Sequence, residues 1–418
     1  MEKKKQIDCF LPYSTVAMVQ SLAAQLYESG VVKNIYTLAA DVLPTEALPQ
    51  YVRQLQTGGL LSLATMRLIA TTATADYALL YLKQGPITLG YHALERMLQV
   101  AEETGAAMVY ADHYSVEAGK TVKHPVTAYQ LGSIRDDFDF GSVVLLKTEY
   151  LKEYAVREVA KDYQFAGWYD LRLFLSREGE LFHLNEYLYT EEEDDLRASG
   201  EKQFDYVNPR NREVQIEMEQ AATAHLSAIK ALVDTTQYVQ PDFSAETFPV
   251  EASVVIPVFN REKTVRDAVV SALSQKTDFP FNVIVVDNHS TDGTTEILSS
   301  LAADECLVHL IPTRTDLGIG GCWNYAINDA HCGRFAVQLD SDDLYSSENT
   351  LQTIVNAFHE QKAAMIVGSY RMCDFDLNTL PPGLISHNEW TEDNGCNNAL
   401  RINGLGAPRA FFTPLVRQ

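Results

Sequence analysis

The sequence lacks any long apolar segment, and no run approaches the ~18 residues that a helix needs to cross a bilayer. It begins with a basic stretch, Lys3-Lys4-Lys5, but Asp8 and Pro12 follow too soon for the apolar core of a signal peptide. We therefore expect a cytoplasmic protein. Peripheral contact with a membrane surface stays open as an alternative.

Basic residues and paired cysteines are also scarce. The 33 Lys and Arg are outnumbered by 56 Asp and Glu, giving a net charge of -23. Nucleic-acid binding needs clustered positive charge, so we expect no nucleic-acid partner. None of the six cysteines forms a C-x-x-C pair, which argues against a zinc site or a disulfide framework. The length of 418 residues suggests two or three domains.

Strands and helices alternate in the second part of the sequence. Short apolar runs at 253–258, 282–286, 307–311 and 335–339 predict buried strands. Helical spacing between them predicts helices at 262–274, 294–301 and 323–330, the first with Asn260 as a plausible N-cap. This alternation predicts an α/β fold with a mostly parallel sheet that is covered on both faces.

The first part of the sequence repeats this plan at a constant offset of 257. Ala106-Ala107-Met108 falls on Ala363-Ala364-Met365, and the apolar run 77–82 falls on 334–339. An apolar helical stripe falls in the same register; its members are Leu94, Met97, Leu98 and Ala101 in the first part and Leu351, Ile354, Val355 and Phe358 in the second. We predict two copies of one fold, at 1–190 and 248–418. Residues 191–247 would form a linker with one helix near 213–233, and its acid run 191–195 would be a solvated face.

Polar residues gather at the predicted carboxyl ends of three strands. These segments are Pro257-Val258-Phe259-Asn260, Asp287 to Asp292, and Asp340-Ser341-Asp342-Asp343. Ligands of open parallel sheets bind beyond such strand ends. Two acids separated by one residue can hold a divalent cation that bridges a diphosphate to the protein. The D-x-D pattern also occurs at 137–139 and 374–376, but only the one at 340–342 directly follows a strongly apolar strand.

Four segments in order resemble family 2 glycosyltransferases, which have the GT-A fold. They are 253–260, 284–287, 292–294 and 339–343, and the resemblance covers about 248–418. It implies inverting transfer of a sugar from a nucleotide-diphosphate donor to a glycan or other hydroxyl acceptor, with Mn or Mg. It also implies site residues: Pro257, Val258, Phe259, Asn260 and Ser341 in the nucleotide-sugar pocket, Asp287 at the base, Asp340 at the ribose or metal, and Asp342 at the metal.

One departure from the family concerns a basic residue. After a Gly-containing loop the family usually has Arg-Asn, where this sequence has Trp323-Asn324. Asn324 is retained as a pocket residue. Arg314 could replace the missing Arg, or Trp323 could stack on the ligand.

A second departure concerns the general base. The family usually carries a catalytic carboxylate far downstream of the metal motif, and Trp168-Tyr169-Asp170 of the first copy resembles that segment. The offset of 257 places its counterpart near position 427, beyond Gln418. We therefore expect the base to lie outside this sequence, the chain to be a fragment, and donor binding to exceed transfer. Asp374 or Glu389 could stand in.

The first copy has the opposite defect. Lys83-Gln84-Gly85 occupies the register of the D-x-D motif, and a Lys there cannot ligate a divalent cation. We expect a degenerate domain with a structural or acceptor-binding role.

Three rival interpretations stay open. Gly318-Ile319-Gly320, with Asp340 downstream, imitates the fingerprint of a dinucleotide-dependent oxidoreductase, but Trp323 holds the place of the third Gly. A nucleotidyltransferase would use the same metal ligands. A non-catalytic scaffold would bind the nucleotide sugar without turnover.

Overall fold

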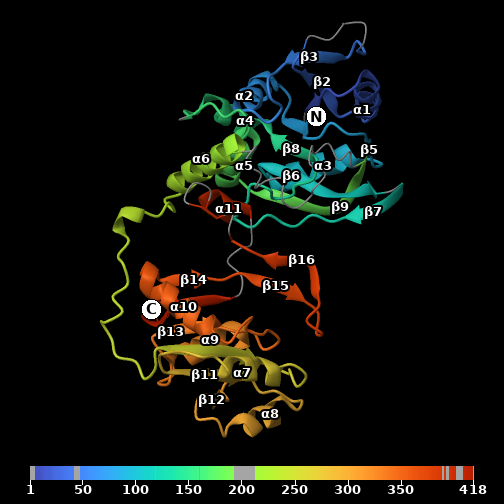
Figure 1. Cartoon of the computed structure of the whole chain (residues 1–418). Coiled ribbons are helices and arrows are strands. Elements are labelled where there is room, and N and C mark those ends of the chain that lie inside the picture. The colour runs from blue at the N-terminus through green and yellow to red at the C-terminus, as the bar shows by residue number, and fades with distance from the viewer. Residues whose placement is uncertain are drawn as a thin grey trace. The chain divides into compact units, whose positions relative to one another are not determined.

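The computed structural model describes residues 5–41, 48–117, 119–159, 161–192, 212–387, 390–391, 395–401 and 408–417. The chain forms two compact units (Figure 1). Unit 1 comprises Met1–Val233 with Glu392–Ile402, and unit 2 comprises Asp234–Thr391 with Asn403–Gln418. Within the described ranges, no helix combines the length and apolar character needed to cross a membrane. The domain limits expected at 190 and 247 remain a prediction.

Unit 2 is built on a six-stranded sheet with the order β12-β11-β10-β13-β17-β14. The strands are β10 (Ala252–Val258), β11 (Phe281–Asp287), β12 (Leu307–Leu310), β13 (Phe335–Gln338), β14 (Met365–Val367) and β17 (Arg409–Phe412). The first four are mutually parallel, and β17 is antiparallel to both β13 and β14. Strands β10 and β13 are wholly buried, which explains why they appear in the sequence as uninterrupted apolar runs.

Helices cover both faces of this sheet. They are α7 (Val265–Leu273), α8 (Thr294–Leu301), α9 (Gly318–Asn328), α10 (Thr350–Gln361) and the short α12 (Thr413–Val416). Helix α9 packs Cys322 and Ala326 against Val255 and Ile284 on one face. Helices α7, α8 and α10 form the larger core on the other face. The predicted α/β class, with a mostly parallel covered sheet, is confirmed.

Unit 1 contains a nine-stranded sheet with the order β3-β2-β1-β4-β8-β6-β9-β5, and β7 pairs with β6. Its strands are β1 (Ile7–Pro12), β2 (Val32–Ala39), β3 (Val52–Gln56), β4 (Tyr77–Tyr81), β5 (Ile87–Leu89), β6 (Met108–Glu117), β7 (Lys120–His124), β8 (Val143–Lys147) and β9 (Leu181–Glu192). Its helices are α1 (Val16–Glu28), α2 (Leu63–Thr72), α3 (Ala93–Thr104), α4 (Thr148–Val156), α5 (Gly167–Glu178), α6 (Arg212–Ala228) and α11 (Gly395–Arg401).

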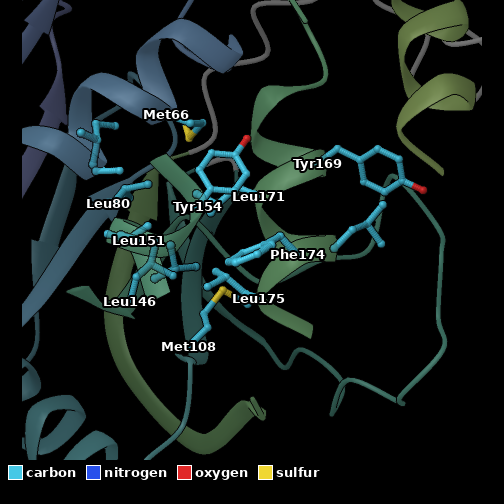
Figure 2. Close-up of a cluster of buried hydrophobic side chains, with 14 of the residues drawn as sticks. Met66, Leu80, Met108, Leu146, Leu151, Tyr154, Tyr169, Leu171, Phe174 and Leu175 are labelled. Carbon is cyan, nitrogen blue, oxygen red and sulfur yellow. The ribbon is translucent and has the colours of Figure 1, made fainter. Parts of the chain in front are cut away.

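The core of unit 1 is strongly apolar. Figure 2 shows part of it, where Tyr154 and Phe174 of the helices lie among Leu80, Met108 and Leu146 of the sheet. Helices α1 and α3 supply a second cluster on the other face. The helix expected near 213–233 is α6, and it packs on α5 of this unit. Unit 1 is therefore itself a covered α/β sheet.

The two sheets share one strand order. The path β3-β2-β1-β4-β8-β6 corresponds to β12-β11-β10-β13-β17-β14, with the same parallel and antiparallel pairings at each step. Helices α3 and α10 both have 12 residues and begin at Ala93 and Thr350, in the register of the sequence repeat. These facts favour the predicted repeat, while the degenerate role of unit 1 remains a prediction.

The offset of 257 ends at β14. The segment between β6 and β8 forms strand β7. The corresponding segment between β14 and β17 is longer and forms β15 (Tyr370–Cys373), β16 (Thr379–Ile385) and α11. The extrapolation of this offset to position 427 therefore loses its basis.

Two local predictions need correction. Helix α9 begins at Gly318, not near Trp323, because the Gly-containing loop itself starts the helix. The acid run 191–195 is not a uniformly solvated face, because Glu191 is buried in β9. Its residues 193–195 lie outside the described residues.

Candidate functional site

A pocket of about 510 Å³ opens at the carboxyl ends of β10 and β13. The two strands are parallel neighbours, so the segments that follow them leave the sheet at the same edge. The residues that line this pocket are Pro257, Val258, Phe259, Arg261, Asn288, Gly318, Ile319, Cys322, Asp340, Ser341 and Asp342. Six of the predicted site residues are thus brought together: Pro257, Val258, Phe259, Asp340, Ser341 and Asp342.

The D-x-D acids Asp340 and Asp342 lie two and four residues beyond the end of β13. Burial, followed by the negative charges of Asp340 and Asp342, raises the pKa of the adjacent Asp343. The basic residue Arg261 also lines the pocket, and its Nε lies 3.6 Å from Asp342 Oδ2. The mouth of the pocket therefore carries an excess of negative charge, which favours a cationic ligand.

Asp340 is held by a chain of hydrogen bonds that the sequence did not reveal. Gln338 is 5% exposed, and its Nε2 donates to Asp340 Oδ1 at 2.9 Å. Arg409 on β17 donates from Nε to Gln338 Oε1 at 3.0 Å. Arg409 of the antiparallel strand β17 thus acts through Gln338 to orient one carboxylate oxygen of Asp340.

The acids fit a divalent cation that is shared with a phosphate ligand. Among the described residues, no group of three or more His, Cys, Asp or Glu side chains forms a complete metal site. Mg²⁺ is commonly bound through one or two carboxylates, with phosphates and waters supplying the other ligands. Within the part of the chain that the structure describes, Asp342 has an ion pair only with the half-exposed Arg261, and Asp340 has none. The donor set of Asp340 and Asp342 is therefore suitable for Mn²⁺ or Mg²⁺.

Asp287 ends β11 as predicted, but it does not line the pocket. It is fully buried, accepts from Ser290 N at 2.9 Å and from Thr295 Oγ1 at 2.5 Å, and lies 3.7 Å from His309 Nε2. Burial opposes its ionisation, but the hydrogen bonds from Thr295 and Ser290 lower its pKa. The oxygens of Asp287 are thus engaged in fixing the turn after the strand.

Asn288, the next residue, lines the pocket instead. Its backbone N–H donates to Val258 O at 2.9 Å, which ties the ends of β10 and β11 together. Its side-chain Oδ1 is buried and has no hydrogen-bond partner among the described residues. The sequence placed Asn288 only within a polar turn and did not single it out.

Asn260 joins two loops and does not cap α7. It has a left-handed backbone with φ of 52°, its Oδ1 accepts from Thr291 N at 2.7 Å, and its own N–H donates to Ser290 Oγ. Thr264 is the residue at the N-cap of α7, so the capping prediction was wrong. Asn260 is not among the residues that line the pocket; it connects the turn after β10 to the turn after β11.

Arg314, Trp323 and Asn324 lie outside the pocket lining. Arg314 forms a two-pronged ion pair with Asp316 at 2.9 Å, and both side chains are largely exposed. Both Asn324 oxygens, backbone and side-chain, accept from Asn328. Trp323 is partly buried against the α9 core. The basic residue that does line the pocket is Arg261.

The two acids considered as stand-ins for the general base are not shown to face the pocket. Asp374 accepts N–H groups of its own turn, from Asp376 at 3.0 Å and Asn378 at 2.8 Å. Glu389 lies outside the described residues.

The corresponding strand end of unit 1 holds an internal ion pair. Lys83, which follows β4, binds Glu191 of β9, and Ser142 Oγ donates to the same carboxylate. His113 Nε2 lies 3.1 Å from Glu191 Oε1. Burial opposes ionisation here, but the contact with His113 and the hydrogen bonds from Lys83 and Ser142 lower the Glu191 pKa to about 2. At this strand end the positive charge is therefore supplied by the Lys83 side chain of the protein itself.

Asp170, whose segment resembles the base-bearing one, is committed to the core of unit 1. It is 6% exposed, accepts from Tyr154 Oη at 2.8 Å, and binds Arg157. These partners fix the first turn of α5.

The fold and the pocket place unit 2 among α/β domains that bind ligands at the carboxyl ends of parallel strands. Residues 253–412 match the family model described as Glycosyl transferase family 2. The chain thus carries a domain that belongs to this family.

Two curated relatives illustrate the match. The chain is 27% identical over 148 residues to the putative teichuronic acid biosynthesis glycosyltransferase TuaG of Bacillus subtilis, covering 35% of this chain and 58% of that protein. It is 24% identical over 140 residues to the O-antigen chain rhamnosyltransferase WbaN of Salmonella anatum, covering 34% and 43%. The chain thus spans about half the length of these relatives.

A search of solved structures matched TarS 1-349 of S. aureus in complex with UDP-GlcNAc. The sequence identity is 24%, the match covers 40% of this chain and 46% of that one, and the TM-score is 0.32.

Proposed function

We propose that unit 2 is a metal-dependent, inverting glycosyltransferase that moves a sugar from a nucleotide-diphosphate donor to a glycan or other hydroxyl acceptor. The observation that carries this proposal is the pair Asp340 and Asp342 at the mouth of the 510 Å³ pocket, in a domain of family 2. The names of TuaG and WbaN refer to teichuronic acid and O-antigen, which favours a glycan acceptor.

The donor would lie along the strand ends. The nucleoside would contact Pro257, Val258 and Phe259, and Phe259 is about half exposed, which leaves its ring accessible to a base. Asn288, which lines the pocket, would border the base or ribose in the place that the family resemblance gives to the neighbouring Asp287. Ser341 would border the ribose and the diphosphate.

Asp340 and Asp342 would hold the cation, with Asp340 oriented by Gln338. When bound, Mn²⁺ or Mg²⁺ supplies positive charge that stabilises the diphosphate as a leaving group. Inversion also requires a general base beside the acceptor hydroxyl. The resemblance to the family implies a carboxylate downstream of the metal motif for this step. Cytoplasmic location and contact with a membrane surface remain predictions.

A thermal-shift screen tests the donor. UDP-, GDP- and dTDP-sugars are added to the full chain with Mn²⁺, with Mg²⁺ or with a chelator. We expect one nucleotide class to raise the melting temperature, and only with metal, because bound ligand stabilises the folded state. A shift that is the same in the chelator would contradict the metal role, and a shift with a nicotinamide dinucleotide would favour an oxidoreductase.

A product assay separates the remaining alternatives. Release of nucleoside diphosphate in the presence of a glycan acceptor supports the transferase. Binding without release identifies a scaffold, and release of pyrophosphate from a nucleoside triphosphate and a sugar phosphate identifies a nucleotidyltransferase.

A further inference from the structure

Arg261 is the only basic residue among the described residues that line the pocket. It lies in the turn after β10, and its Nε is 3.6 Å from Asp342 Oδ2. The side chains are 49% and 47% exposed, so the contact is an open ion pair at the pocket mouth. Such pairs are weak and easily exchanged.

The backbone of Arg261 is fixed although its side chain is accessible. Its N–H donates to Thr294 Oγ1 at 2.8 Å, which ties the turn to the start of α8. The guanidinium makes one longer hydrogen bond, from Nη1 to Asn260 O at 3.2 Å. Rotation of the side chain therefore leaves the turn intact.

The charge balance of the pocket changes when donor and metal enter. A divalent cation on Asp342 would repel a guanidinium that stays within 4 Å of the same carboxylate. The donor simultaneously brings a diphosphate, whose oxygens suit the planar fork of an Arg. Arg314, which the sequence suggested as a replacement for the family's missing Arg, is paired with Asp316 outside the pocket.

We propose that Arg261 is an exchangeable counterion: it neutralises Asp342 in the metal-free site and binds the diphosphate in the loaded site. This inference rests on the proposed function and adds a specific phosphate-binding residue to it. It also explains how a site that lacks the family's usual Arg before Asn324 offers positive charge to the donor.

The exchange predicts effects of opposite sign from one substitution. Arg261→Ala removes the competitor for Asp342, so the full chain should bind Mn²⁺ alone about two- to fivefold more tightly. The same variant loses a charge-assisted bond to phosphate, so UDP or GDP at saturating Mn²⁺ should bind roughly tenfold more weakly. Electron paramagnetic resonance of free Mn²⁺ measures the first, and calorimetry with UDP and separately GDP measures the second.

Two further variants serve as controls. Arg261→Lys keeps the charge, so Mn²⁺ affinity should stay near that of the wild type while nucleotide affinity falls only in part. Arg266→Ala removes an exposed Arg of α7 that donates to Ser300 Oγ, and it should change neither affinity.

The outcomes distinguish this inference from the proposed function. If the wild type binds neither UDP nor GDP with Mn²⁺, the proposed function fails and the inference fails with it. If the wild type binds but Arg261→Ala weakens both affinities, or leaves either unchanged, the exchange alone is overturned.

Discussion

Gln338 Nε2 donates to Asp340 Oδ1 at 2.9 Å, and this bond links the last residue of β13 to the first acid of the D-x-D motif. Gln338 is buried, and its Oε1 accepts from Arg409 on β17. The side chain thus uses both its donor and its acceptor to fix one carboxylate. In metal sites, partners behind the ligands typically orient them.

We predict that Gln338→Leu weakens Mn²⁺ binding by about tenfold, because loss of a residue behind a ligand typically costs 10- to 100-fold in metal affinity. Leu has a similar size and keeps the buried position filled. Titration of Mn²⁺ in the presence of UDP measures the effect. Gln361→Leu, at the exposed end of α10, is the control. An unchanged Mn²⁺ affinity in Gln338→Leu would show that Asp340 needs no orientation.

The second prediction concerns the metal ligand itself. Asp342→Ala should abolish the dependence of nucleotide binding on Mn²⁺, because the bridging cation loses a charged ligand. The matched control is Asp376→Ala, which alters the D-x-D pattern of an exposed turn at 374–376. Calorimetry that finds the same Mn²⁺ dependence in Asp342→Ala as in the wild type would refute the assignment.

The sequence predicted the strands of the site because parallel strands buried on both faces leave uninterrupted apolar runs. Residues 253–258 and 335–339 were expected as strands, and β10 and β13 occupy Ala252–Val258 and Phe335–Gln338. The polar segments after these two strands follow from the same pattern, so most of the pocket lining could be named in advance.

The direction of single side chains could not be predicted in this way. Asp287 and Asn288 are adjacent and both polar, yet the Asp287 carboxylate accepts hydrogen bonds from Ser290 and Thr295, and only Asn288 lines the pocket. The contact between Gln338 and Arg409 joins residues 71 positions apart, and no periodicity records it. Such details depend on tertiary contacts, which explains why Arg314 was considered and Arg261 was missed.

A third prediction concerns the buried carboxylate of unit 1. The Glu191 pKa of about 2 lies below its ordinary value of 4.5, so its ionised form stabilises the folded state. This contribution is complete above pH 4.5 and is lost as the pH falls through about 2. It amounts to at most about 3 kcal/mol, and less after screening because Lys83 is half exposed.

Glu191→Gln should therefore lower the free energy of unfolding at pH 7, and its difference from the wild type should shrink between pH 4.5 and 3. Urea titrations at several pH values measure this difference. Glu192→Gln, on the same strand but exposed, should have little effect at any pH. A Glu191→Gln difference that grows as the pH falls would mean that the carboxylate is not held in its ionised form.

The last prediction is that the chain binds one nucleotide diphosphate and not two, although its two sheets share a strand order over six strands. In unit 2 the segment after β13 offers Asp340 and Asp342 to a cation. In unit 1 the segment after β4 carries Lys83, which forms an ion pair with Glu191. Because Lys83 cannot ligate a cation and already neutralises Glu191, we expect no divalent cation to bind at this strand end. Calorimetry with UDP or GDP at saturating Mn²⁺ should give a stoichiometry of one per chain. Asp342→Ala should remove the metal-dependent binding, whereas Lys83→Met should leave it unchanged. A stoichiometry of two, or residual Mn²⁺-dependent binding in Asp342→Ala that Lys83→Met alters, would place a second donor site in unit 1.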